Sequence, residues 1–229
     1  MVGPGVTSPP LGAATSQIAI VIPCYNERAT LGDVVERCQE FGTVLVIDDG
    51  STDGSRDIAL AAGAQVLRTA GRTGYDGAIE HGLQAAYDQG YQVIITIDAD
   101  GEHDPACLAS FVAAHARGIP LVIGVRPAPQ RLAEWLVCFY CRRRFGINDI
   151  LCGMKGYTRP VLQAYFASEK PNLVNTWPTL MWSAQGGAFE QIAVTGVPRT
   201  DTPRFQSLLR ANLRIAGMLW PIAQLVIHK

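Results

Sequence analysis

Short apolar runs rich in β-branched residues alternate along this chain with longer stretches that repeat apolar positions at helical spacing. The short runs predict strands, and the first five occupy Ile18–Ile22, Thr43–Ile47, Gln65–Arg68, Gln92–Ile97 and Leu121–Val125. The intervening stretches predict helices, among them residues 54–62 and 75–89. Strands alternating with helices are typical of βαβ units. The sequence therefore predicts an α/β fold with a mostly parallel sheet sandwiched by helices.

The pattern is less regular after residue 126. It predicts a short strand within 148–157 and a longer one at Phe189–Val197, and it predicts helices at 131–144, 159–168, 173–185 and an amphipathic segment from about 205 to 227. We expect a single domain over residues 17–229, preceded by a flexible tail at 1–16 that lacks the basic start and apolar core of a signal peptide. The longest apolar stretch, Ile215–Ile227, is interrupted by Pro221 and is too short for a membrane-spanning helix.

Charge is distributed unevenly between the two halves of the chain. Residues 1–110 hold 15 Asp and Glu against 5 Lys and Arg, whereas residues 111–229 hold 14 Lys and Arg against 5 Asp and Glu. An acidic half beside a basic half favours a site where metal-binding carboxylates face phosphate-binding cations, although uneven surface charge gives the same count. The six cysteines are scattered and are typical of small buried residues in a reduced, cytoplasmic protein.

Two carboxylates follow the most apolar of the predicted strands. Asp98 and Asp100 are spaced i, i+2, so both side chains can point the same way at the carboxyl end of the strand. Like charges there call for a cation, and hard divalent ions take carboxylate oxygens. The pattern indicates a Mg²⁺ or Mn²⁺ site that in turn holds a diphosphate.

A second polar cluster follows the second strand at Asp48–Ser55. Its short side chains and glycines predict a tight turn, with Asp53 or Ser55 as the cap of the next helix. Capping alone does not explain the adjacent acids Asp48 and Asp49. One acid at the end of a core strand can accept hydrogen bonds from a nucleobase or ribose.

Taken together, these segments resemble the inverting family 2 glycosyltransferases, which have a Rossmann-like GT-A fold. The resemblance covers residues 18–126 and rests on Ile20–Glu27, Asp48–Ser55, Arg72–Gly74 with Ala78 and Gly82, Asp98–Asp100 with His103 and Pro105, and Gly124–Arg126. It implies that residues 18–126 bind a UDP- or GDP-linked sugar. The nucleotide-sugar residues that it implies are Pro23, Tyr25, Glu27, Asp49, Arg72 and Asp98, with Asp98 and Asp100 positioning Mg²⁺ or Mn²⁺.

Residues 127–204 resemble the acceptor half of the polyprenyl-phosphate branch of this family. Asp149–Lys155 is similar to that branch's Asp-x-x-Ser-Gly-aromatic-Arg element. It departs from the element by having Cys152 in place of the serine, Met154 in place of the aromatic residue and Lys155 in place of the arginine. The Gly-x-Ser-Lys expected after Arg204 is also replaced, by Phe205–Leu208. The resemblance implies acceptor-phosphate binding by Arg126, Arg131, Lys155 and Arg204.

The catalytic residues implied are Asp100, Arg126 and Asp149. With a saccharide or other alcohol acceptor, Asp149 is the base that takes the acceptor's proton. With a polyprenyl phosphate no strong base is needed, and Asp149 orients an arginine or the sugar. A loop aspartate that only accepts backbone hydrogen bonds is a third interpretation. An alternative of another class is a non-catalytic domain that binds nucleotide or a partner protein.

The C-terminal segment 205–229 has apolar residues on one face with Arg204, Arg210 and Arg214 beside them. This pattern fits an interfacial helix on an anionic membrane and equally a helix packed on the domain. Arg142–Arg144 is read as a solvated helix end that could also meet lipid headgroups. Nothing indicates sequence-specific nucleic-acid binding. We expect a cytoplasmic protein with peripheral contact to the inner face of the membrane.

Overall fold

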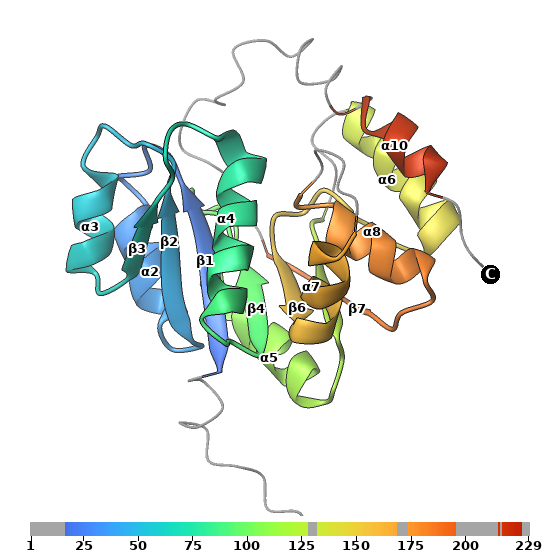
Figure 1. The fold of residues 1–229 in the computed structure, drawn as a ribbon, viewed down its shortest axis with the longest axis horizontal. Coiled ribbons are helices and arrows are strands. Elements are labelled where there is room, and N and C mark those ends of the chain that lie inside the picture. The colour runs from blue at the N-terminus through green and yellow to red at the C-terminus, as the bar shows by residue number, and fades with distance from the viewer. Residues whose placement is uncertain (1–16, 128–131, 169–173, 196–214, 216, 226–229) are drawn as a thin grey trace, which may run out of the picture.

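The computed structural model describes residues 17–127, 132–168, 174–195, 215 and 217–225 of the chain. Seven strands form one sheet in the order β3-β2-β1-β4-β6-β5-β7 (Figure 1). The strands are β1 Ile18–Cys24, β2 Thr43–Asp48, β3 Gln65–Arg68, β4 Val93–Thr96, β5 Leu121–Val125, β6 Lys155–Thr158 and β7 Glu190–Ala193. The first five were predicted from the sequence to within two residues at each end.

Helices cover both faces of the sheet, so its central strands are apolar on both sides. All seven residues of β1 are buried, and the sheet separates two hydrophobic clusters. The helices are α2 Leu31–Cys38, α3 Ser55–Ala61, α4 Gly74–Asp88, α5 Leu108–Ala116, α6 Leu132–Phe145, α7 Arg159–Phe166, α8 Trp177–Ala184 and α10 Leu219–Gln224, with a 3₁₀ turn at Pro105–Cys107. None of the described helices is long and apolar enough to cross a bilayer.

The helix α4 lies close against β1 and β2 because Gly82 has no side chain. A Cβ atom at Gly82 would come within 2.4 Å of Val21 Cγ1 and 2.9 Å of Ile47 Cγ1. This close packing fixes the start of α4, and with it Tyr75, relative to the ends of the strands. Asp104 caps the 3₁₀ turn that begins at Pro105, because its side chain accepts a hydrogen bond from the Ala106 backbone N–H.

One strand departs from the parallel pattern, and this departure shapes the site. β6 runs antiparallel to both β4 and β5, with Thr96 opposite Lys155. A strand that runs backwards begins at the edge where its parallel neighbours end. The loop that precedes β6, Asp149–Met154, is therefore brought to the carboxyl ends of β4 and β5.

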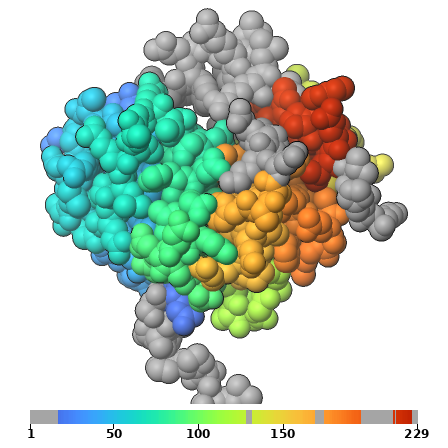
Figure 2. All heavy atoms as spheres, in the orientation of Figure 1, coloured from blue at the N-terminus to red at the C-terminus, as the bar shows by residue number. Residues whose placement is uncertain are grey.

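The described part of the C-terminal segment packs on the domain. Ile222 of α10 is fully buried in the same hydrophobic cluster as Val137 of α6 and Leu180 of α8. Figure 2 shows the surface of α10 continuous with neighbouring parts of the domain. Trp220 of α10 is 72% exposed. Most of the predicted amphipathic segment lies outside the described residues.

Candidate active site

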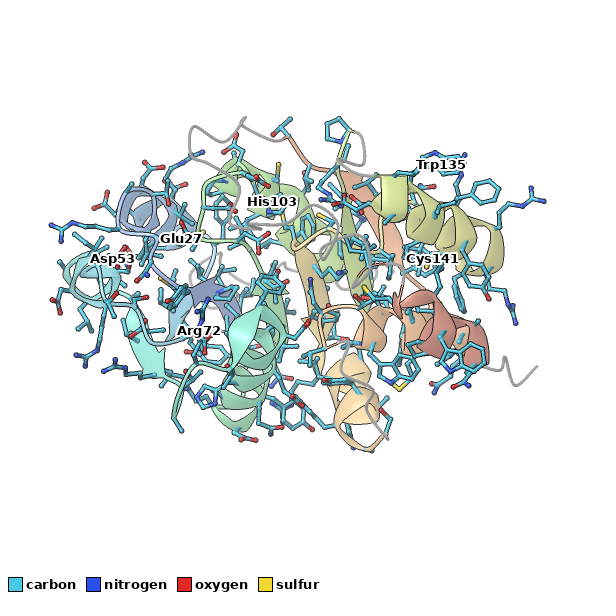
Figure 3. All side chains as sticks on the ribbon, turned by 90° about the horizontal axis from the view of Figure 1, so that it is seen from above. Glu27, Asp53, Arg72, His103, Trp135 and Cys141 are labelled. Carbon is cyan, nitrogen blue, oxygen red and sulfur yellow. The ribbon has the colours of Figure 1, made fainter. Side chains whose placement is uncertain are left out.

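Polar side chains from the loops that follow β1 to β5, and from the loop that precedes β6, gather at the carboxyl end of the parallel strands. Figure 3 views the molecule from this end, where Glu27, Arg72 and His103 are labelled on three different segments. In open α/β sheets ligands bind at this edge. The polar clusters that follow β1, β2 and β4 therefore share one edge of the sheet.

Several of the residues predicted to bind the nucleotide lie around the end of β1. Pro23 is buried in β1, and Tyr25 follows it with the guanidinium of Arg72 stacked over its ring at 4.1 Å from the centroid. Glu27 is fixed through its backbone N–H, which donates to Ser55 Oγ at 2.8 Å. A cation on an aromatic face gives a flat, electropositive wall. Such a wall suits a base or ribose next to phosphates.

Asp49 is only 3% exposed and fixes the loop that carries Arg72. Its Oδ1 accepts hydrogen bonds from the Thr73 N–H, the Thr73 hydroxyl and the Thr69 hydroxyl, and its Oδ2 accepts from the Gly74 N–H at 2.7 Å. Burial opposes its ionisation, but these hydrogen bonds outweigh burial and hold the pKa of Asp49 below its ordinary value. A direct contact from Asp49 to the base or ribose stays a prediction.

Asp98 and Asp100 follow β4, as the spacing predicted. The Tyr75 hydroxyl donates to Asp98 Oδ1 at 2.8 Å, and His103 Nδ1 lies 3.4 Å from Asp98 Oδ2 without forming a hydrogen bond. Asp100 Oδ1 accepts from the Glu102 N–H at 3.0 Å across the turn at Gly101, whose φ is +75°. The two carboxylates are therefore held by different partners.

Gly153 lies directly against the Asp98 carboxylate. A Cβ atom at Gly153 would fall 2.1 Å from Asp98 Oδ2, far inside van der Waals contact. The loop before β6 thus closes over the first acid of the pair, and only glycine leaves room for it. The sequence contained this glycine within Asp149–Lys155 but gave no indication that it contacts Asp98.

We expect Gly153→Ala to lower the rate of the sugar transfer that the sequence resemblance implies by about 10²-fold, because a misplacement of about 1 Å at a reacting centre costs that much. The methyl group must push the Asp98 carboxylate away from its present position. Steady-state rates with and without Mn²⁺ would measure the loss. Gly217→Ala is the matched control, since a Cβ at Gly217 meets nothing within 4 Å. Wild-type rates in Gly153→Ala would mean that the loop yields and Asp98 does not move.

Arg126, whose side chain is 19% exposed, and the buried Asp149 form an ion pair at the end of β5. Arg126 Nε donates to Asp149 Oδ2 at 2.7 Å and Nη2 donates to Oδ1 at 3.0 Å, while Glu134 Oε2 of α6 lies 3.5 Å from Nη2. Burial raises the pKa of Asp149, but the ion pair with Arg126 outweighs burial and brings that pKa below its ordinary value. Glu134, which the sequence did not single out, anchors α6 to this pair.

Lys155 is completely buried behind these groups. Its Nζ donates to the Cys152 carbonyl at 2.7 Å, and burial lowers the pKa of Lys155 to about 8. This buried position does not favour the predicted contact of Lys155 with the acceptor phosphate. It indicates instead that Lys155 stabilises the loop before β6 through the Cys152 carbonyl. Arg131 and Arg204 lie outside the described residues. Their predicted phosphate contacts stay predictions.

Sequence comparisons give a consistent set of relatives. The family model "Glycosyl transferase family 2" matches residues 19–133. An undecaprenyl-phosphate mannosyltransferase of Micrococcus luteus is 32% identical over 168 residues, which cover 65% of this chain and 69% of the relative. A polyprenol monophosphomannose synthase of Mycolicibacterium smegmatis is 31% identical over 213 residues, which cover 83% and 79%.

Structural comparison agrees with the sequence relatives. Glucosyl-3-phosphoglycerate synthase from Mycobacterium tuberculosis, crystallised with Mn²⁺, uridine diphosphate and phosphoglyceric acid, has a TM-score of 0.76. The match covers 97% of this chain and 84% of that chain at 22% identity. At this identity the likeness shows the fold alone.

Proposed function

Since this chain belongs to glycosyl transferase family 2 and has the GT-A fold, we propose that it transfers a sugar from a nucleotide diphosphate sugar to a polyprenyl phosphate. An oxygen of the acceptor phosphate attacks the anomeric carbon, and the bond from that carbon to the diphosphate breaks. The electron pair leaves with the nucleoside diphosphate. Direct displacement inverts the anomeric centre without a covalent enzyme intermediate.

The observation that carries this proposal is the bidentate pair of Arg126 with Asp149. An alcohol acceptor needs a base, and a carboxylate held ionised by a guanidinium at both oxygens is a poor proton acceptor. An acceptor phosphate is already anionic and needs no general base. Asp149 then orients Arg126, whose planar donors suit phosphate oxygens. The named activities of the two sequence relatives support the same acceptor class.

The acid pair fits a divalent ion of the kind that is shared with a nucleotide. The described residues include no group of three His, Cys, Asp or Glu side chains able to hold a metal. Mg²⁺ is commonly bound by only one or two carboxylates together with substrate phosphates. Asp98 and Asp100 supply two carboxylates, so we assign them as ligands of Mg²⁺ or Mn²⁺. The bound ion would stabilise negative charge on the departing diphosphate.

The donor side follows from the contacts around β1. Tyr25 and Arg72 form a stacked wall, and Asp49 holds the loop of Arg72 in place. We propose that Pro23, Tyr25 and Glu27 line the nucleoside pocket of a UDP- or GDP-linked sugar, with residues 18–126 as the donor half and residues 127–204 as the acceptor half. The acceptor is a lipid, and we therefore place the protein at the inner face of the cytoplasmic membrane.

Replacement of Asp149 by Asn separates the two acceptor classes. We expect about a tenfold loss of transfer or less, because Asn keeps one oxygen that can accept from Arg126, whereas loss of a general base costs roughly 10²- to 10⁴-fold. Transfer rates are compared at a temperature where thermal unfolding shows both proteins folded. A loss near the upper end of that range would favour an alcohol or saccharide acceptor with Asp149 as its base.

The direct test is transfer from radiolabelled UDP- and GDP-sugars to a short-chain prenyl phosphate, with the matching prenyl alcohol as control. The proposal expects label in the prenyl phosphate only, and only with Mg²⁺ or Mn²⁺ present. Transfer to the alcohol alone would exclude the phosphate acceptor. Nucleotide binding that is indifferent to metal, with no transfer to either acceptor, would indicate a non-catalytic binding domain.

A further inference from the structure

The outer side of α6 exposes large apolar residues that no described part of the chain covers. Leu132 is 74% exposed, Trp135 51%, Leu136 44% and Phe139 52%. Their spacing of i, i+3, i+4 and i+7 places them in one stripe along the helix. The rings of Trp135 and Phe139 stack at 5.4 Å between centroids. We call these four residues the α6 stripe.

The opposite side of α6 is anchored in the protein. Ala133, Glu134, Val137, Cys138 and Cys141 are all buried. Figure 3 shows Trp135 pointing out from the molecule, while Cys141 lies on the interior side of the same helix. The buried face of α6 holds the helix in place, so the stripe is a fixed part of the protein surface.

α6 also connects the stripe to the acceptor side of the site. Glu134 lies between Leu132 and Trp135 in sequence, and its carboxylate is 3.5 Å from Arg126 Nη2. Cys138 Sγ lies 3.7 Å from Asp149 Oδ1. A surface in contact with the stripe is thus only one helix thickness away from the Arg126–Asp149 pair.

The charged residues of α6 indicate which kind of partner surface could cover the stripe. Arg142, Arg143 and Arg144 are exposed at its C-terminal end, and its single acidic residue, Glu134, is buried. Every exposed residue of α6 is therefore either a large apolar side chain or an arginine. Aromatic and aliphatic residues beside arginines are the composition of helices that lie in the headgroup region of an anionic membrane.

We propose that the α6 stripe inserts into the headgroup region of an anionic lipid bilayer, with Arg142–Arg144 on the lipid phosphates. The inference rests on the proposed function, because a polyprenyl phosphate carries its phosphate at headgroup level. Docking through α6 brings the Arg126–Asp149 pair to that level. A bilayer fits the exposed arginines better than a second copy does, since α6 offers no exposed acid to pair with them.

Vesicle flotation of the full chain tests the proposal, with phosphatidylcholine vesicles that contain or lack phosphatidylglycerol. We expect binding to the anionic vesicles to fall about tenfold or more in Trp135→Ser/Phe139→Ser, because interfacial binding scales with the apolar area buried. Arg142→Gln/Arg143→Gln/Arg144→Gln should lose about 10²-fold and its dependence on phosphatidylglycerol, since each basic residue near an anionic surface contributes roughly fivefold and the three factors multiply. Leu60→Ser, on α3 and 47% exposed in the wild type, is the matched control and should bind like wild type.

Failure of the wild type to float, or flotation of the aromatic double variant at wild-type levels, would overturn the proposal. So would a wild-type dimer that the double variant abolishes, because a second copy would then cover the stripe. Sugar transfer to a water-soluble short-chain prenyl phosphate distinguishes the proposed function from the proposed docking surface. The double variant should retain this transfer, because a soluble acceptor does not require binding to a membrane. Vesicle binding without transfer to any phosphate would contradict the proposed function, and transfer without vesicle binding would contradict the docking surface.

Discussion

Asp100→Ala is expected to remove Mn²⁺-dependent nucleotide binding and to lower sugar transfer by about 10²- to 10³-fold or more, the usual loss when a group that stabilises transition-state charge is removed. The reason is the small number of ligands. Asp98 already accepts from Tyr75 and faces His103, and the described residues offer no cluster of three side chains that would retain the ion. Binding of nucleoside diphosphates by calorimetry, with and without Mn²⁺, measures the effect separately from turnover.

Asp88→Ala is the control for this experiment. Asp88 is the exposed last residue of α4, and its Oδ1 accepts a hydrogen bond from Gln84 Nε2, so its loss removes one carboxylate without touching the site. Both variants should unfold at nearly the wild-type temperature. If Asp100→Ala kept metal-dependent binding while Asp88→Ala behaved as wild type, the assignment of Asp100 to the metal would be wrong.

Arg126→Ala is expected to cost about 3–5 kcal/mol in the free energy of unfolding, because it leaves a buried charge without its partner. Both Asp149 and Glu134 face Arg126, and both are nearly inaccessible to solvent. Transfer to a prenyl phosphate should be lost as well, since the guanidinium is the assigned phosphate contact. Urea unfolding at pH 7 measures the first effect, and transfer assays on the folded fraction measure the second.

Arg117→Ala provides the contrast. Arg117 pairs with Glu190 at 2.7 Å, but the side chains are 56% and 35% exposed to solvent, and such surface pairs contribute only about 0–1 kcal/mol. Equal destabilisation by the two replacements would contradict the importance of burial at Arg126. Arg126→Lys should recover part of the stability but not the transfer, because an ammonium group lacks the planar pair of donors.

The effect of Arg126 on stability should also depend on pH. The folded-state pKa of Asp149 is lowered, so the ion pair stabilises the fold fully above the unfolded pKa of about 3.9 and loses this contribution as the pH falls through the lower folded value. The difference between wild type and Arg126→Ala should therefore be constant near neutral pH and shrink in strong acid. Unfolding curves for both proteins over that range provide the measurement.

The sequence by itself determined the parallel part of the sheet and the position of the acid pair. Short apolar runs predicted the positions of β1 to β5, but β3, at the edge of the sheet, has no buried residue. Asp98 and Asp100 were found because the i, i+2 spacing after a strand is a local signal. The motifs in residues 18–126 led to the GT-A fold and family 2, which the family match and the structural comparison confirm.

Only the tertiary structure decided how the second half meets the first. Sequence order did not reveal that β6 runs antiparallel, and it is this reversal that brings Gly153 against Asp98. The sequence proposed a base or an orienting role for Asp149, and the pairing with Arg126 across 23 positions favours orientation. Lys155 was expected at the acceptor phosphate but is buried. Periodicity and motif spacing record local conformation, whereas the partner of a charged side chain depends on which loops the sheet order brings together.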